Sequence, residues 1–207
     1  MRPLIFFLCV FLLVPGAFTA HAAEGPASSV AMLQKAIDGM DTDLLEKYLD
    51  IPEVTRKNAQ YAVELLEKNP SLRKEAQKSP VLAFAMMSLG SKGASEALAA
   101  LVAHEAQSFV HYGVASGAFA GKPGSGKNPG DPGLLFAPLL KGDERDVKRF
   151  DDIRVLEQSG DTARIAASLY DGTRKKSYPL ELEATRRDGI WRITDVLNRE
   201  KLAALPE

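Results

Sequence analysis

The side chains that could carry out acid–base or metal chemistry are few in this sequence. Beyond residues 1–22 it has two histidines, His104 and His111, and its only cysteine, Cys9, lies within those N-terminal residues. The two histidines are seven residues apart on one expected helix, a rise of about 10.5 Å, which is too long for both to bind one metal ion. We therefore expect no metal site, no bound cofactor and no cysteine nucleophile. His111 beside a carboxylate could act as a general base; the alternative is a structural histidine at the edge of the core.

Asp195 is the carboxylate whose position in the pattern best suits chemistry. In the expected last strand, Trp191, Ile193 and Asp195 occupy alternate positions, so strict alternation places Asp195 on the face that points toward the helices. Burial there would raise its pKa into the range of a catalytic acid or base. The alternatives are that Asp195 lies where the strand leaves for solvent, or that it caps the turn that begins at Asn198.

Four aromatic residues could line a small-molecule pocket together with Asp195. Phe109 and Tyr112 lie on an expected long helix, and Tyr178 and Trp191 lie on expected strands. An apolar cavity with a few polar groups at its mouth is the usual form of such a site. The alternative is that these side chains close into a solid core, with Trp191 as a buried anchor.

The elements that must position these residues fall into two halves. The first, about residues 28–112, has the apolar spacing of helices. Signals for the start of a helix recur along it, at Ser28 or Ser29, Asp41, Pro52 and Pro80. An apolar run over residues 81–89 predicts a buried helix, and residues 97–112 predict a long one. This half should form a layer of packed helices.

The second half, about residues 151–196, alternates with the period of strands. Turn signals at residues 159–161, 171–172 and 188–189 divide it into four runs, and the charged segment 143–149 before it is expected to be solvated. The predicted fold is α+β, with the helices packed on one face of a curved antiparallel sheet of about four strands. The residues expected in its core are Leu33, Leu101, Phe109, Leu169, Leu182 and Trp191.

A stretch rich in glycine and proline, residues 121–133, separates the two halves. Eight of its thirteen residues are Gly or Pro, which predicts a solvated loop that can be shortened at little cost. Residues 121–127 fit the phosphate-loop spacing G-x-x-x-x-G-K, but Asn128 stands where a magnesium-binding hydroxyl is needed, and prolines follow where a helix must begin. We interpret the match as coincidental. The apolar residues 134–140 should dock back as a short helix or as a lid over the pocket.

Residues 1–22 have the layout of a secretory signal peptide. Arg2 precedes an apolar run over residues 4–14, and Ala20 and Ala22 precede a cut near Ala23. As a helix the run would span about 16 Å, half of a bilayer core, which is too short for a membrane anchor. The net charge of −1, with basic residues scattered among acids, does not indicate a nucleic-acid partner. We expect one domain, residues 23–207, without a membrane span and exported to a bacterial periplasm, or secreted otherwise.

Two segments carry a resemblance to a known family. The first, residues 36–45 (AIDGMDTDLL), joins two short helices at Asp41, and the second, residues 189–196 (GIWRITDV), is the expected closing strand. In this order of elements the chain resembles the nuclear-transport-factor-two-like, or cystatin-like, cone. Its segment through Leu49–Asp50–Ile51–Pro52 also resembles a group of exported bacterial proteins of unknown activity. Members of the superfamily include isomerases, dehydratases, cyclases and non-catalytic binding modules, so the resemblance implies a fold and not one activity.

Two classes of function follow. In the first, the chain is a non-catalytic binding module for a small apolar ligand such as a lipid, or for a protein partner. In the second, it is an isomerase or dehydratase in which Asp195 or His111 is the base and Tyr112 or Tyr178 donates a hydrogen bond. We favour binding, because no spacing in the sequence brings a catalytic set together.

Overall fold

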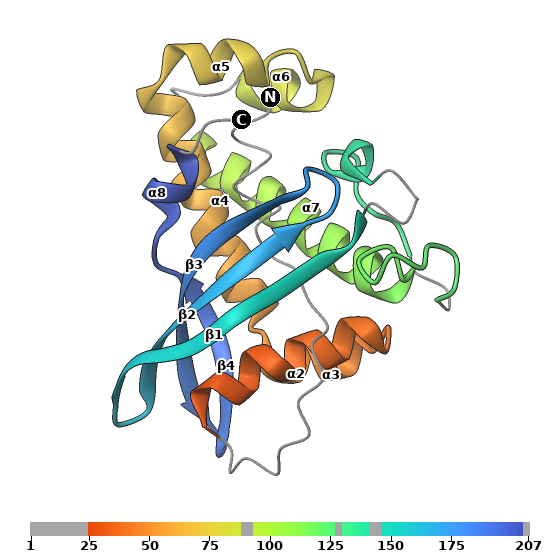
Figure 1. The fold of residues 1–207 in the computed structure, drawn as a ribbon. Coiled ribbons are helices and arrows are strands. Elements are labelled where there is room, and N and C mark those ends of the chain that lie inside the picture. Colours follow the sequence, from red (N-terminus) through yellow and green to blue (C-terminus); the bar gives the residue numbers. More distant parts are fainter. Residues whose placement is uncertain (1–24, 88–92, 127–129, 141–145, 205–207) are drawn as a thin grey trace.

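The computed structural model describes residues 25–87, 93–126, 130–140 and 146–204. The predicted signal peptide and Asn128 lie outside these ranges. The elements in chain order are α2 (Pro26–Asp38), α3 (Thr42–Tyr48), α4 (Ile51–Lys68), α5 (Pro70–Ala76), α6 (Pro80–Met86), α7 (Ala94–Ala115), η1 (Ala137–Leu139), β1 (Lys148–Ser159), β2 (Thr162–Asp171), β3 (Lys176–Arg187), β4 (Ile190–Val196) and α8 (Arg199–Ala203). Helices therefore precede a four-stranded antiparallel sheet of order β1-β2-β3-β4, which confirms the predicted α+β fold (Figure 1).

Two aspartates begin helices, Asp41 as the sequence predicted and Asp50 just before the predicted Pro52. The carboxylates of Asp41 and Asp50 accept hydrogen bonds from the backbone N–H groups of Leu44 and Glu53, at 2.9 and 3.2 Å. Each satisfies one of the N–H groups that a helix leaves unpaired at its start.

The prediction that Ser28 or Ser29 caps the first helix is wrong. That helix begins at Pro26, because a proline has no N–H to leave unpaired in the first turn. The two serine hydroxyls instead donate back to the carbonyls of Gly25 and Pro26, each at 2.6 Å.

The strands pair through tight turns. At the turn between β3 and β4, Asp188 and Gly189 have φ angles of 52° and 81°, the two positive values that a type I′ hairpin requires. β1 begins earlier than predicted, at Lys148, and the expectation that segment 143–149 is solvated is corrected: Asp146 is 1% exposed and Lys148 8%.

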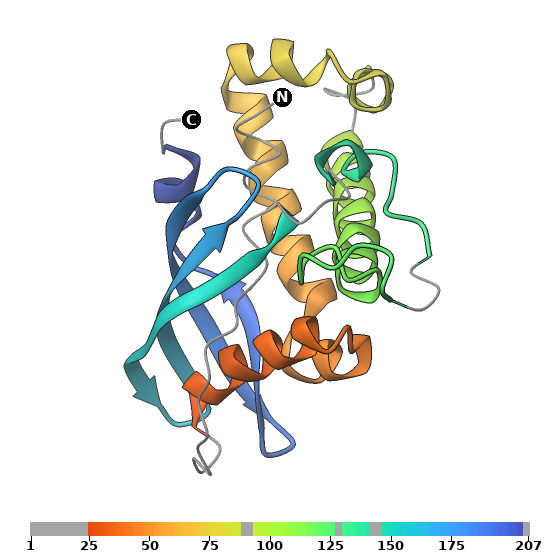
Figure 2. The ribbon, with the colours of Figure 1, turned by 45° about the vertical axis from the view of Figure 1, so that its right-hand side comes forward.

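The helices lie in two layers over the sheet. α2 and α4 pack against the sheet, and α7 packs mainly on α4, so that α4 lies between the sheet and α7 (Figure 2). The buried side of α7 includes Ala99, Ala103 and Ala106 beside larger residues such as Leu98 and Val102, and small side chains allow two helices to approach closely. The prediction of Leu101 as a core residue is wrong, since Leu101 lies half-buried at the margin of this side.

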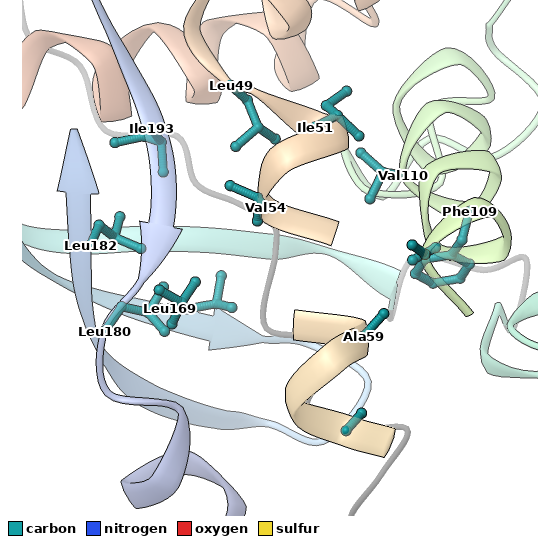
Figure 3. Packing of buried hydrophobic residues seen from close by; sticks show 14 of the residues in the cluster. Leu49, Ile51, Val54, Ala59, Phe109, Val110, Leu169, Leu180, Leu182 and Ile193 are labelled. Carbon is teal, nitrogen blue, oxygen red and sulfur yellow. The ribbon is translucent and has the colours of Figure 1, made fainter. Parts of the chain in front are cut away.

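Apart from Leu101, the predicted core residues are buried, between 1% and 4% exposed: Leu33, Phe109, Leu169, Leu182 and Trp191. Figure 3 shows how the sheet, α4 and α7 contribute to one apolar interior, with Leu180 and Leu182 from β3, Val54 and Ala59 from α4, and Phe109 and Val110 from α7. The Trp191 indole belongs to the same cluster, as a core anchor would.

The apolar run at residues 81–89 forms only the short helix α6. Leu82 and Met86 are buried, whereas Met87 is 82% exposed, and the rest of the run lies outside the described residues. Within the described part of the chain, no helix combines the length and the apolar character that crossing a membrane requires.

The start of the glycine-rich loop packs on the end of α7, which corrects the expectation of a wholly solvated loop. The N–H groups of Lys122 and Gly124 donate to the carbonyls of Gly117 and Ser116, at 2.8 and 3.0 Å. A Cβ on Gly126 would stand 1.5 Å from the Ala115 carbonyl oxygen, so only glycine fits there. In the described part of the phosphate-loop match, residues 121–126, no helix begins.

Candidate functional site

Three phenyl rings meet where α7 faces the segment that follows the loop. The Phe109 ring lies 5.4 Å from that of Phe119, edge to face, and 5.8 Å from that of Phe136. Gly113, one turn after Phe109, makes room for this arrangement, because a Cβ on it would stand 1.6 Å from the Phe119 ring. We call these three rings the ring cluster. Each of its members is 5% exposed or less.

Residues 130–140, which we call the cover segment, lie along α7 (Figure 2). Leu135 and Phe136 are buried at 6% and 5% exposure, whereas Leu134 between the loop and these two is 71% exposed. The segment ends in a short 3₁₀ helix, η1. The prediction that residues 134–140 dock back as a short helix is thus confirmed for the described residues, and their action as a lid stays a prediction.

One hydrogen bond connects the cover segment to the rest of the described chain. The backbone N–H of Leu135 donates to Glu105 Oε2 on α7 at 2.8 Å, while the segment's other hydrogen bonds are internal. Gly133, at φ 77°, lets the chain pass over Glu105, since a Cβ there would stand 2.8 Å from the same carboxylate oxygen. Among the described residues, the segment is therefore held by this polar contact, by buried Leu135 and Phe136, and by partly buried Leu139 and Leu140, which pack against the core.

Buried polar residues adjoin the ring cluster where β1 begins. Lys148 Nζ forms an ion pair with Asp171 Oδ1 at 2.7 Å and donates to Thr173 Oγ1 at 3.1 Å. The Thr173 hydroxyl donates to Asp146 Oδ1 at 3.2 Å. We call these four residues the polar cluster. The backbone N–H of Lys148 donates to the carbonyl of Phe119 at 3.1 Å, so the start of β1 is joined to the backbone of the residue that carries one of the rings.

Tyr178 lies near the polar cluster, two residues into β3 and 5% exposed. Burial raises the pKa of its phenol, and a hydrogen bond with Arg174 acts in the opposite direction. Sequence reasoning missed the polar cluster, although one signal was present: Lys148 and Phe150 share a strand face, so a lysine stands on an apolar face.

The prediction that Asp195 shares a face with Trp191 and Ile193 is wrong. Ile193 pairs with Ala184, but Asp195 pairs with Glu183, so one extra residue, Thr194, stands in β4. Such a bulge reverses the alternation of side chains beyond it. Asp195 therefore does not stand in the apolar interior beside Trp191.

The Asp195 carboxylate is engaged by two cations. Its Oδ2 lies 3.2 Å from Lys57 Nζ on α4, and its Oδ1 pairs with the Arg199 guanidinium and accepts from the backbone N–H of Val196 at 2.7 Å. Burial lowers the pKa of the Arg199 guanidinium, and Arg199 Nε also donates to Asn58 Oδ1 at 3.2 Å. This agrees with the alternative in which Asp195 fastens the turn after β4.

The five predicted pocket residues do not gather in one place. Tyr178 stands near the beginning of β3, whereas Trp191 pairs with Arg186 near its end, eight residues or about 26 Å away along the strand. Tyr112 is half-buried on α7. The expectation of a single pocket lined by all five is corrected, and a binding role for Phe109 or Tyr178 alone stays a prediction.

The histidines lie on the surface of α7. His104 is exposed, and His111 Nε2 lies 3.5 Å from Glu46 Oε1, with both side chains partly or largely in solvent. Among the described residues, no group of three or more His, Cys, Asp or Glu side chains could hold a metal ion.

Comparison of the chain with protein-family models, with curated proteins and with solved structures found no match. The class that the structure itself defines is an α+β protein with a helical layer on a four-stranded sheet. Its candidate site is the ring cluster, the polar cluster and the cover segment.

Proposed function

We propose that this chain is a non-catalytic binding module that holds a small apolar or amphipathic ligand, such as a lipid, against the ring cluster. The observation that carries the proposal is the cover segment, which places Leu135 and Phe136 in the interior but, within the described ranges, is joined to the rest of the chain by one hydrogen bond, to Glu105. If the segment moves away from α7, it exposes apolar rings that a ligand can cover.

The arrangement of polar and apolar groups supports an amphipathic ligand. Phe109 and Phe119 form an apolar surface, and Lys148 with its partners adjoins it through the Phe119 carbonyl. Ligand sites in proteins commonly combine an apolar lining with a few polar groups that fix orientation. An apolar chain would lie on the rings, with a polar head near Lys148.

Asp195 and His111, the two acid–base candidates, already have charged partners. This favours a binding role over the activity of an isomerase or dehydratase. Both carboxylate oxygens of Asp195 have cationic partners, Lys57 and Arg199. His111 has a surface glutamate beside it. A general base needs a free lone pair aimed at substrate in a sheltered site, and neither residue has that surrounding.

We also infer export and family from the sequence. Residues 1–22 support cleavage near Ala23 and a periplasmic location, and the order of elements supports the nuclear-transport-factor-two-like cone. N-terminal sequencing of the protein secreted by its own host should begin within a residue or two of Ala23. A mature chain that retained residues 4–14 would contradict the inference.

Titration with defined probes tests the binding proposal. We expect saturable binding of a long-chain fatty acid or of an environment-sensitive apolar dye, read by the change in dye fluorescence and by competition between the two. Glu105→Ala removes the acceptor for the Leu135 N–H and should speed association and dissociation of the probe. Glu105→Gln keeps an oxygen acceptor in nearly the same shape and is the matched control. Absence of saturable binding by any probe would leave only a protein partner or a structural role.

A further inference from the structure

The outer half of β1 is an exposed edge of the sheet. β1 is the first strand in the order β1-β2-β3-β4, and its residues 154–159 are all exposed. With β2 it forms a hairpin that projects from the body of the molecule (Figure 1). An edge strand presents backbone N–H and C=O groups that another strand can pair with.

Two apolar residues stand together on this edge. Val155 pairs with Ile165 of β2, Leu156 is the extra residue of a bulge that follows it, and the two are 41% and 46% exposed. They are flanked by charges of opposite sign, Arg154 and Glu157, which pair with residues on the other face of β2. The exposed edge thus has a small apolar centre between two opposite charges.

We propose that this edge binds the same edge of a second copy of the chain in an antiparallel, two-fold symmetric pair. The sequence Arg154–Val155–Leu156–Glu157 is self-complementary in that arrangement. With the axis between the two central residues, Arg154 of each copy opposes Glu157 of the other, and Val155 opposes Leu156. Opposite charges and aliphatic pairs directly across two strands are favourable, and an isologous contact uses the same patch on both copies.

The charges also fix the register. A slip by one residue in either direction moves Arg154 away from Glu157 and removes both ion pairs. From residue 151 to residue 160 the proposed register places no two like charges opposite each other. Glu157 is free to exchange partners, because its contact with Arg164 within the chain is 3.8 Å long and both side chains are about half exposed or more.

The irregularity of β1 around Asp152 limits the contact to a pair. Asp152, at φ 52°, lies in a second irregularity of β1 between Asp151 and Arg154, and a bulge interrupts a regular ladder of hydrogen bonds. Pairing therefore stops after a few residues, and a two-fold contact closes on itself and does not extend into a fibre.

Charge reversal tests the proposal by sedimentation of the purified protein over a wide range of concentration. The unchanged chain should form a reversible dimer. Arg154→Glu alone or Glu157→Arg alone should raise the dimer dissociation constant about tenfold or more, since each converts two attractive pairs into two repulsive ones. An equimolar mixture of the two single variants should recover the dimer as a heterodimer, and the double variant should recover it as a homodimer.

Lys74→Glu, an exposed charge reversal on α5, is the control and should leave the constant unchanged. Circular dichroism verifies that every variant is folded. A chain that is monomeric throughout would overturn the proposal. So would a dimer that is insensitive to the single reversals, or single variants that do not associate when mixed. None of these outcomes bears on the binding of an apolar ligand, which is measured separately.

Discussion

The two sides of α4 are held together by different means. On the side of the sheet, polar contacts are many: the Asp50 N–H donates to the Ile193 carbonyl at 2.9 Å, Lys57 Nζ donates to the Thr194 carbonyl at 3.3 Å, and Arg199 Nε donates to Asn58 Oδ1 at 3.2 Å. Asp195 adds its ion pairs with α4 and α8. On the side of α7, the cover segment has one hydrogen bond to the rest of the described chain.

The difference indicates which part of the interior can open. Regions with few hydrogen bonds to the rest of the protein open at low free energy, whereas densely bonded regions open only with global unfolding. We therefore expect the cover segment to detach while β4 and α4 stay joined. A change within the cover segment can then cost no more than the free energy of docking that segment.

Trp191→Ala should give the largest loss on the sheet side. The indole is 3% exposed, and truncation of a buried aromatic ring to alanine costs about 3 to 5 kcal/mol. The measurement is the free energy of unfolding in denaturant. Surface substitutions usually change the free energy of unfolding by about 0.5 kcal/mol or less. A loss below about 1 kcal/mol would therefore place Trp191 outside the core.

Asp195→Ala should cost about 2 to 3 kcal/mol. Removal of one partner of a buried ion pair leaves the other charge uncompensated, which costs about 3 to 5 kcal/mol when burial is complete. The expected value is lower here because the Lys57 side chain is 26% exposed. Asp195→Asn, which keeps the shape and an acceptor, should lose less than Asp195→Ala; equal losses would mean that charge contributes nothing.

Phe136→Ala should cost only about 1 to 2 kcal/mol of global stability, although Phe136 is nearly as buried as Trp191. Detachment of the cover segment limits the loss, whereas an ordinary core phenylalanine would lose about 3 to 5 kcal/mol. Phe109→Ala is the matched control on α7 and should show the full core value. Equal losses of unfolding free energy in Phe136→Ala and Phe109→Ala would mean that the cover segment does not detach more easily than the rest of the core.

Glu105→Ala should have the smallest effect on global stability, about 1 kcal/mol or less, because it too acts only on the docking of the cover segment. Its local effect is larger. Exchange of the Leu135 amide hydrogen should become about tenfold faster, the change expected for loss of one hydrogen bond to a charged group. Glu105→Gln should show little change. Unaltered exchange in Glu105→Ala would mean that other contacts hold the segment.

The parts of the fold that depend on local chemistry could be predicted from the sequence. Asp41 begins a helix because its carboxylate caps the helix, and Asp188–Gly189 turns because both residues accept positive φ. Alternation likewise indicated the buried face of β2 and β3, including Leu169 and Leu182. Each of these rules refers to neighbours within a few residues.

The candidate site could not be predicted in the same way, because it depends on strand register and on ion pairs between residues far apart in the sequence. One extra residue at Thr194 moved Asp195 off the predicted face, and no periodicity reports a bulge in advance. Lys148 lies in a charged run that suggests solvent, yet it is buried because Asp171, 23 residues later in the chain, neutralises it. The Leu101 prediction was wrong for a further reason: the buried side of α7 carries Leu98, Val102 and Phe109 together with several alanines, and Leu101 lies at its margin.

Native mass spectrometry of the protein purified from its own host tests the proposed function most directly. Because a ligand held behind the cover segment should survive gentle purification, we predict added mass that corresponds to a small apolar or amphipathic molecule and that is lost when the protein is unfolded. The same species should be released faster from Glu105→Ala than from Glu105→Gln. A protein that carries only its own mass, and that also fails to bind fatty acid or apolar dye in titration, would contradict the account.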